Sequence, residues 1–209
     1  MIIISFGYTC YVKSLVNLTR CKRESDLFDW MNSFEFNKII KCLEHDGNIF
    51  SNIIKSPLDV DLKSPNVYFN DFYKFRLPHE TSINESKITY KRRHERFLNY
   101  KNTDDKYLFI RLINGGRYDI EPEYIENNYN EDCFNRIMNY LPSNSRILLI
   151  SDCKMTRDEL NKVYHKFIMV DDCMNPEHVF YGKYLHKKEV IIDCYKSCFE
   201  YIDTHFDNC

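Results

Sequence analysis

KYLFIRLI, residues 106–113, is the stretch that decides the fold class of this chain. Its apolar run encloses one charge, at Arg111, and such a run is typical of a strand buried on both faces of a sheet. NEDCFNRIMNYL (130–141) follows with helical spacing of its apolar residues, and SRILLISD (145–152) has the pattern of a second buried strand. A strand, a helix and a strand in this order predict a parallel βαβ unit.

The same alternation extends toward both ends of the chain. Ser25 or Asp26 would cap one helix, and Thr81 or Ser82 would cap another. We therefore predict an α/β fold in which a single domain, residues 1–209, holds a mostly parallel sheet flanked by helices. Further strands are expected at 1–6, within 66–77 and at 165–172, and further helices at 10–18, 25–47, 81–102, 155–164 and 187–206.

The composition limits the class of protein. With 209 residues, 44% of them apolar, the chain is long enough for one well-buried domain. The 29 basic and 31 acidic side chains leave a net charge of −2, which argues against general nucleic-acid binding. Residues 1–6 lack the features of a signal peptide, and no run approaches the roughly 18 apolar residues of a membrane span. We expect an intracellular, cytoplasmic protein without membrane contact, and its oligomeric state stays open.

The richness in Asn, Ile, Lys and Tyr is typical of an AT-rich genome. A viral source, and then the host cytoplasm, fits this composition. The nine cysteines form no CxxC pair, and no HExxH helix is present, so we expect mostly buried free thiols, no metal site and no cofactor.

Cys10 is the cysteine whose position favours chemistry. It follows the first predicted strand and opens a predicted helix, where free N–H groups and the helix dipole favour a thiolate. Gly7 allows a tight turn before it. A thiol that only packs the start of the helix explains the same pattern. Of the seven histidines, His79 lies between aromatic strands and a helix cap, and it is the candidate base for Cys10.

Asp29 is an unusual charge between two aromatic residues in the sequence FDW (28–30). It would cap N–H groups, orient a histidine or bind substrate, and capping is the simplest of these roles. Trp30 beside it is either a core residue or a stacking platform. Arg111, inside an apolar strand, needs the strand end or a carboxylate partner, for which Asp29 and Glu80 are candidates.

Three arginines occur close together in YKRRHERF (90–97). Arg92 and Arg96 stand four residues apart on one helical face, with Arg93 to one side. Guanidinium groups in this arrangement suit carboxylates and phosphates, whereas a solvated helix paired with nearby acids is the structural alternative.

Taken in order, these elements resemble a domain-of-unknown-function family described as papain-like cysteine peptidases. The likeness covers residues 1 to about 113 and resides in Gly-x-x-Cys (7–10), FDW (28–30), LPHE (77–80), YKRRHERF (90–97) and LFIRL (108–112). It implies Cys10 as nucleophile and His79 as base, and a papain-like α+β fold as the alternative to the α/β fold. Glu80 stands where the family more commonly has Asp. The remaining site residues it implies are Asp29, Arg92, Arg93, Arg96 and Arg111.

Three functions follow from these patterns. The first is a cysteine-dependent hydrolase or transferase, peptidase-like by resemblance, that acts on a peptide or small acyl substrate. The second is an α/β enzyme or module that binds an anionic or phosphorylated ligand through the arginines. The third is a non-enzymatic interaction protein, viral if the composition reflects its source. In each case we expect the site at the carboxyl ends of the strands, where open α/β sheets bind ligands.

Overall fold

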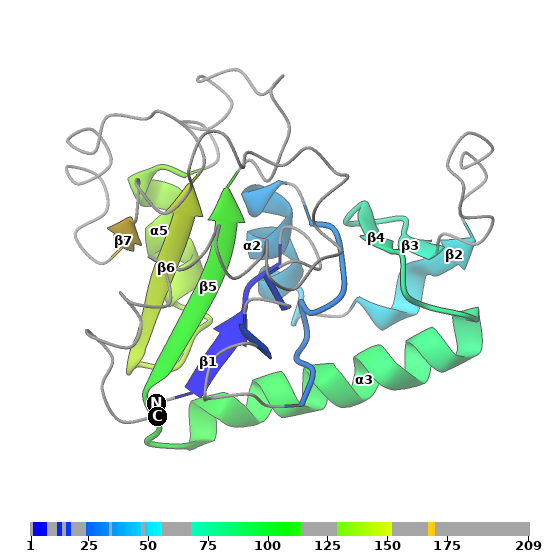
Figure 1. The fold of residues 1–209 in the computed structure, drawn as a ribbon, viewed down its shortest axis with the longest axis horizontal. Helices are drawn as coiled ribbons and strands as arrows, with labels where there is room; N and C mark the ends of the chain where they lie inside the picture. The colour runs from blue at the N-terminus through cyan, green and yellow to red at the C-terminus, as the bar shows by residue number, and fades with distance from the viewer. Residues whose placement is uncertain are drawn as a thin grey trace.

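The chain contains a parallel sheet and a smaller antiparallel sheet (Figure 1). The structure is a computed structural model that describes residues 2–7, 12–13, 16–17, 24–33, 35–46, 49–55, 68–113, 129–151 and 167–169. Within these ranges the parallel sheet has, in spatial order, β1 (Ile2–Ser5), β5 (Tyr107–Ile113), β6 (Ser145–Ser151) and β7 (Phe167–Met169). The antiparallel sheet has β2 (Ile53–Lys55), β3 (Tyr68–Asn70) and β4 (Phe75–Leu77).

Three α-helices accompany these strands in the described ranges. They are α2 (Phe36–Glu44), α3 (Ile83–Asn99) and α5 (Glu131–Met138), with short 3₁₀ turns η1 (Phe50–Asn52) and η2 (Tyr100–Asn102). In Figure 1 α3 runs from the antiparallel sheet to the beginning of the parallel strands, and α2 and α5 lie beside the parallel sheet. Helices together with a parallel sheet confirm a mixed α/β protein.

The parallel sheet is buried on both faces. Ile4 pairs in register with Phe109, and both belong with Phe6 to the large hydrophobic core. Ile3 and Ile110 alternate with them, so they point to the opposite face, and they too are fully buried. Burial on both sides explains why these strands are continuous apolar runs in the sequence.

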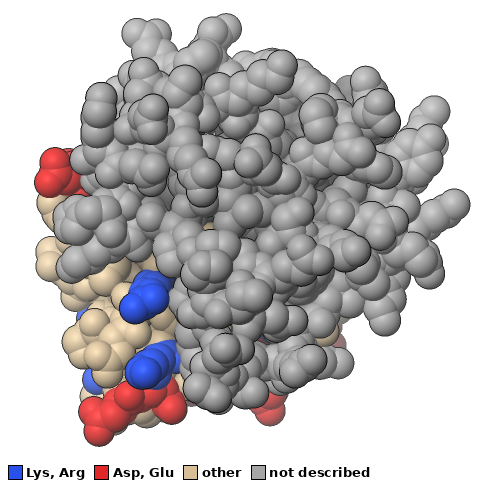
Figure 2. All heavy atoms as spheres, turned by 60° about the vertical axis from the view of Figure 1, so that its left-hand side comes forward, with Lys and Arg blue, Asp and Glu red and all other residues tan. Residues whose placement is uncertain are grey.

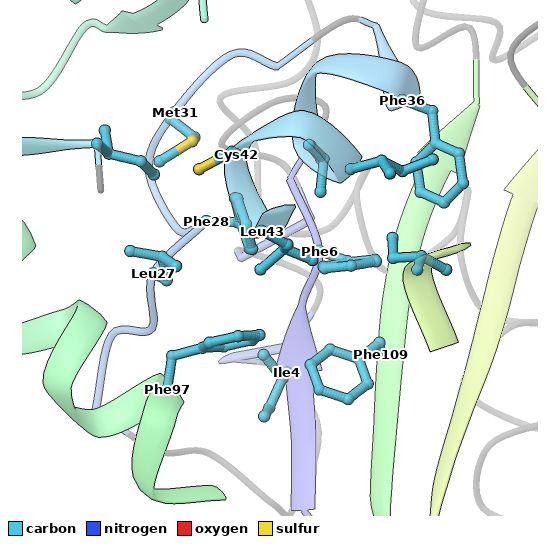
Figure 3. Packing of buried hydrophobic residues seen from close by; sticks show 14 of the residues in the cluster. Ile4, Phe6, Leu27, Phe28, Met31, Phe36, Cys42, Leu43, Phe97 and Phe109 are labelled. Carbon is cyan, nitrogen blue, oxygen red and sulfur yellow. The ribbon is translucent and has the colours of Figure 1, made fainter. Parts of the chain in front are cut away.

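Aromatic rings form the core between β1, β5 and the helices (Figure 3). The ring of Phe6 packs against those of Phe28, Phe36 and Phe109, with centroids 5.3, 6.1 and 5.2 Å away. Phe97 of α3 reaches the same cluster through Phe28, at 6.0 Å. Contacts of this kind are worth about 0.5–1.5 kcal/mol each beyond the area that they bury. They join the residue 24–33 segment to the sheet.

Helix α3 begins where the sequence predicts. The Ser82 hydroxyl accepts the backbone N–H of Glu85 at 3.1 Å, and the Glu85 carboxylate accepts both the Ser82 and the Thr81 hydroxyls, at 3.0 and 2.6 Å. Ser82 is thus an N-cap, which satisfies one of the N–H groups that the first helical turn leaves free. Ser82 is therefore the cap, one of the two residues expected.

One stripe along α3 and η2 is buried at alternating spacings of four and three residues. It consists of Ser86, Tyr90, Arg93, Phe97 and Tyr100, all less than 9% exposed. This spacing keeps one side of a helix facing its neighbours. The stripe places a guanidinium between two aromatic side chains, and that position determines the role of Arg93 described below.

The expected helix at 25–47 is wrong over residues 25–35. Helix α2 begins only at Phe36, and residues 27–30 form turns instead. The reason is a set of contacts made by distant residues, including the backbone pairing of Asn32 with Arg76 of β4. The strand β2 is an element that the sequence did not predict, since only Ile53 of its three residues is buried.

The other strand predictions are confirmed where the chain is described. These are the strands at 1–6, within 66–77, at 106–113, at 145–152 and within 165–172, together with the helix at 130–141. Residues 12–13 and 16–17 are helical as expected. The predicted helices at 155–164 and 187–206, and Gly47, lie outside the described residues.

Candidate functional site

The carboxyl end of β1 turns sharply at Gly7. The residue has φ of +74°, a left-handed conformation that glycine adopts without strain. A Cβ atom at this position would lie 2.3 Å from the Ser33 Oγ, so only a glycine lets the two segments approach so closely. The backbone N–H of Gly7 points back to the Ser5 hydroxyl at 3.4 Å. The turn thus fastens the end of β1 to the end of the residue 24–33 segment.

Arg111 of β5 joins this corner from the neighbouring strand. Its side chain is fully buried, and its two terminal nitrogens donate to the carbonyl oxygens of Phe6 at 3.0 Å and of Ser33 at 2.8 Å. Its Nε donates to the Tyr129 hydroxyl at 2.9 Å, and its guanidinium carbon lies 5.1 Å from the ring centre of Phe36. Burial raises the pKa of Tyr129, and the charge of Arg111 opposes that rise. Arg111 therefore holds the strand ends together.

Asp29 is held by a buried ion pair that the sequence did not predict. Its Oδ2 atom lies 2.7 Å from the ammonium of Lys13, and the two side chains are 0% and 3% exposed. Lys13 also donates to the carbonyl of Glu24 at 3.3 Å. The same Oδ2 accepts the backbone N–H of Asp26 at 2.7 Å. Burial raises the pKa of Asp29 and Lys13 opposes the rise. Asp29 thus caps a turn rather than a helix, and neither it nor Glu80 pairs with Arg111.

Asp26 is a second buried acid in the same turn. Its Oδ1 atom accepts the hydroxyl of Tyr100. Burial raises its pKa from 3.8 to about 6, with a smaller contribution from the nearby charge of Asp29, while the Tyr100 hydrogen bond, Lys13 and Arg96 lower it. Two acids and one ammonium are therefore packed together beneath the turn.

Tyr90 and Arg93 approach this cluster from α3. Arg93 donates to the backbone carbonyl of Asp29 at 3.4 Å, and its guanidinium carbon lies 4.8 Å from the centre of the Tyr90 ring. Burial raises the pKa of Tyr90. Among the described residues, Asp29 Oδ1 and Arg93 Nε are buried and have no hydrogen-bond partner, and the Tyr90 hydroxyl has only Arg93 beside it. Buried polar atoms of this kind are rare in folded proteins.

Trp30 links the turn to His79. It has φ of +61°, which is uncommon for a bulky residue, and its indole N–H donates to the Ser25 hydroxyl at 2.9 Å. Its ring meets that of His79 edge to face, with centroids 5.3 Å apart. Trp30 is half-buried and the His79 side chain is exposed. The structure therefore brings two predicted site residues together from distant parts of the sequence.

The remaining arginines of α3 have different environments. Arg96 donates to the backbone carbonyl of Ser25 and pairs with the Glu24 carboxylate. Arg92 is exposed and makes no hydrogen bond or ion pair with the described part of the chain. Arg93 and Arg96 therefore both donate hydrogen bonds to the segment of residues 24–33, whereas the sequence predicted that Arg92 and Arg96 would act together. Glu80 is half-buried, and its charge raises the pKa of Tyr90.

Cys10, the predicted nucleophile, lies outside the described residues. The chain reaches it three residues after Gly7 and three residues before Lys13, and both of these neighbours contact the segment of residues 24–33. In the ranges that the structure covers, no group of three His, Cys, Asp or Glu side chains is arranged to hold a metal ion. No helix of those ranges is long and apolar enough to cross a membrane.

The described part of the surface in Figure 2 carries acidic and basic side chains next to each other. It shows no broad area of a single sign on that part of the face. Cys42 and Cys133 are buried thiols of the described ranges, and burial raises the pKa of each.

Five residues of the site escaped prediction from the sequence. Four of them have a partner far along the chain, so their neighbours in sequence gave little indication of their roles, and Tyr90 contacts Arg93 within α3. The clearest available signal was the four-and-three spacing that places Arg93 within the apolar stripe of α3. The five residues are Lys13, Asp26, Ser33, Tyr90 and Tyr129.

No protein-family model, curated protein or solved structure matches this chain.

Proposed function

We propose that the chain is a cysteine-dependent hydrolase or transferase for a peptide or small acyl substrate, with Cys10 as nucleophile and His79 as base. The ring contact between Trp30 and His79 supports this most strongly, because it unites two elements that the sequence places far apart. Asp29, next to Trp30, pairs with Lys13, which follows Cys10 by three residues. A continuous set of contacts therefore leads from the chain beside Cys10 to His79.

In this proposal the site belongs to a single α/β domain whose mostly parallel sheet is flanked by helices. The corner of Gly7, Ser33 and Arg111 supports a site at the carboxyl end of β1, because it fixes the backbone from which the chain continues to Cys10. Ligands of open α/β sheets bind at this end of the strands. A thiolate nucleophile also suits a reducing compartment, and the cytoplasm remains our expectation.

The reaction would have two steps. His79 takes the proton of the Cys10 thiol, and the thiolate attacks the acyl carbon to form a thioester. The bond to the leaving group breaks, and that group takes the proton from the imidazolium. Water then cleaves the thioester in a hydrolase, whereas a second nucleophile does so in a transferase. His79 is exposed, so it is accessible to substrate and to solvent protons.

The arginines of α3 support anion binding less well. Arg93 and Arg96 donate to backbone carbonyls of the protein itself, so these described contacts are structural. Arg111 is buried among carbonyls and aromatic rings. Only Arg92 of these four is exposed.

Alkylation of the folded protein by iodoacetamide tests the proposal, with the modification of each cysteine followed by mass spectrometry. Cys10 should react at least about ten times faster at pH 7 than Cys42 and Cys133, whose raised pKa values suppress the thiolate. His79→Asn should slow Cys10, whereas His45→Asn, a change at another exposed histidine, should not. Equal, slow reaction of all three cysteines would contradict a nucleophilic Cys10 and favour a non-enzymatic role.

A further inference from the structure

We propose that Lys13 is a positioning residue of this site: its ion pair with Asp29 holds the Trp30–His79 contact in a fixed relation to the chain beside Cys10. The inference deepens the proposed function and rests on it. Lys13 does not belong to the set of residues that the sequence motifs suggest. Its case depends on a chain of contacts that can be followed from residue to residue.

The first step is the burial of Lys13. An ammonium that is 3% exposed is costly unless it is paired, and this one has Asp29 at 2.7 Å and the Glu24 carbonyl at 3.3 Å. Both partners belong to the segment of residues 24–33. The ion pair therefore fastens the helical residues 12–13 to that segment, because breaking it would leave a buried charge without its partner.

The second step leads from Asp29 to Trp30. Three contacts fix Asp29: the pair with Lys13, the N–H of Asp26 on Oδ2, and Arg93 on its carbonyl oxygen. The next residue, Trp30, has φ of +61°, a conformation that a bulky side chain keeps only where the surroundings determine it. The contacts that fix Asp29 hold the backbone of Trp30 in this conformation.

The third step leads from Trp30 to His79. The hydrogen bond from the indole N–H to Ser25, at 2.9 Å, sets the plane of the ring, and the ring meets His79 at an interplanar angle of 74°. His79 is exposed, and Trp30 is the ring that it contacts within the described residues. Lys13 thus determines the position of the proposed base through two intermediates, without touching it.

The chain contains a single tryptophan, so tryptophan fluorescence reports on the surroundings of Trp30, His79 among them. A protonated imidazole quenches the emission of a neighbouring indole. We expect the emission of Trp30 to fall as the pH is lowered, and His79→Asn should abolish this change. The second readout is the pH profile of Cys10 alkylation, which a purely structural role of Lys13 would not move.

The decisive variant is the double change Lys13→Met with Asp29→Asn. Lys13→Met alone would leave a buried carboxylate without its partner, a loss that can unfold the chain. The double variant removes both charges, and the amide oxygen at position 29 still accepts the N–H of Asp26. Lys74→Met is the matched control, because Lys74 forms an exposed ion pair with Asp71. Cooperative unfolding in urea verifies that each variant is folded.

In the folded double variant the pH-dependent change of Trp30 emission should be largely lost. Cys10 alkylation should slow roughly ten- to hundred-fold, with its pH profile displaced upward, because a misplaced base costs rates of this order. Lys74→Met should match the wild type in both. If the double variant does not unfold cooperatively, Lys13→Leu with Asp29→Asn, which also removes both charges, replaces it and the same readouts decide.

Unchanged emission in the folded variant would overturn the positioning role whatever Cys10 does. An unchanged Cys10 rate would overturn it too, provided that wild-type Cys10 reacts faster than Cys42. If wild-type Cys10 is no faster than Cys42 and the emission still depends on Lys13, the proposed function fails while the placement of His79 by Lys13 stands. The two failures are therefore distinguishable.

Discussion

Arg111 and Asp29 are both fully buried charges, yet their surroundings differ. All three nitrogens of Arg111 donate to a carbonyl or hydroxyl oxygen, and aromatic rings lie against its guanidinium. Within the described part of the chain, Asp29 has side-chain partners on Oδ2 only, and the nearby Arg93 Nε has none. A satisfied buried charge stabilises a fold, whereas unsatisfied polar groups cost free energy and are retained where function requires them. The difference separates a structural corner from a candidate site.

The largest effect is expected at the structural corner. Arg111→Met leaves the carbonyls of Phe6 and Ser33 without their donor, which should lower the free energy of unfolding by about 3–5 kcal/mol. Arg92→Met, at an exposed arginine, should change it by less than about 0.5 kcal/mol. Urea unfolding followed by circular dichroism measures both. A similar small change in the two variants would remove the distinction between the regions.

An intermediate effect is expected from pH, through Asp26. Its folded pKa of about 6 exceeds the ordinary value of 3.8, so between these pH values the folded protein keeps a proton that the unfolded chain has lost. The free energy of unfolding should therefore fall as the pH rises from about 4 to 6, by about 2–3 kcal/mol from this residue.

Asp26→Asn should flatten this part of the pH dependence, because the amide remains neutral throughout. Urea midpoints measured from pH 4 to 7 give the difference between the two proteins. A constant difference over that range would show that Asp26 titrates normally in the folded state.

The smallest effects come from two buried tyrosines that differ in hydrogen bonding. Tyr129→Phe removes the acceptor of Arg111 Nε and should cost about 1.5–3 kcal/mol of unfolding free energy, as for hydrogen bonds to charged groups. Tyr90→Phe removes a hydroxyl whose only polar neighbour among the described residues is Arg93 and should be neutral or slightly stabilising. Thermal unfolding of the two variants compares them directly. A larger cost at Tyr90 would reveal a partner and weaken the contrast.

The sequence predicted the elements whose stability is local. The buried strands are continuous apolar runs, and the cap at Ser82 involves a residue only three positions away. Both features can therefore be recognised in the sequence alone. The prediction of a helix was wrong for residues 25–33, because the turns of this segment depend on contacts with Lys13, Arg93 and Arg76. A turn that distant side chains stabilise has no recognisable pattern in its own stretch of sequence.

The site was predictable to a similar degree. Asp29 and Trp30 were predicted as site residues because a charge between aromatic residues is unusual. The structure places Asp29 within the buried cluster and the half-buried Trp30 at its edge. Arg92 and Arg93 are adjacent letters in the sequence, yet one is exposed and the other buried. The helical spacing of the buried stripe distinguishes the buried Arg93 from the exposed Arg92, whereas the number of charged residues in this stretch does not. The partner of Lys13 could only come from the folded chain.

The contact between Gly7 and Ser33 has a consequence for how this sequence can vary. A side chain at position 7 would overlap the Ser33 hydroxyl and would also have to adopt a left-handed backbone, so a change there meets two separate obstacles. A smaller residue at position 33 removes only the overlap. Any lineage that carries this corner is therefore expected to keep glycine at position 7 while position 33 drifts among small residues.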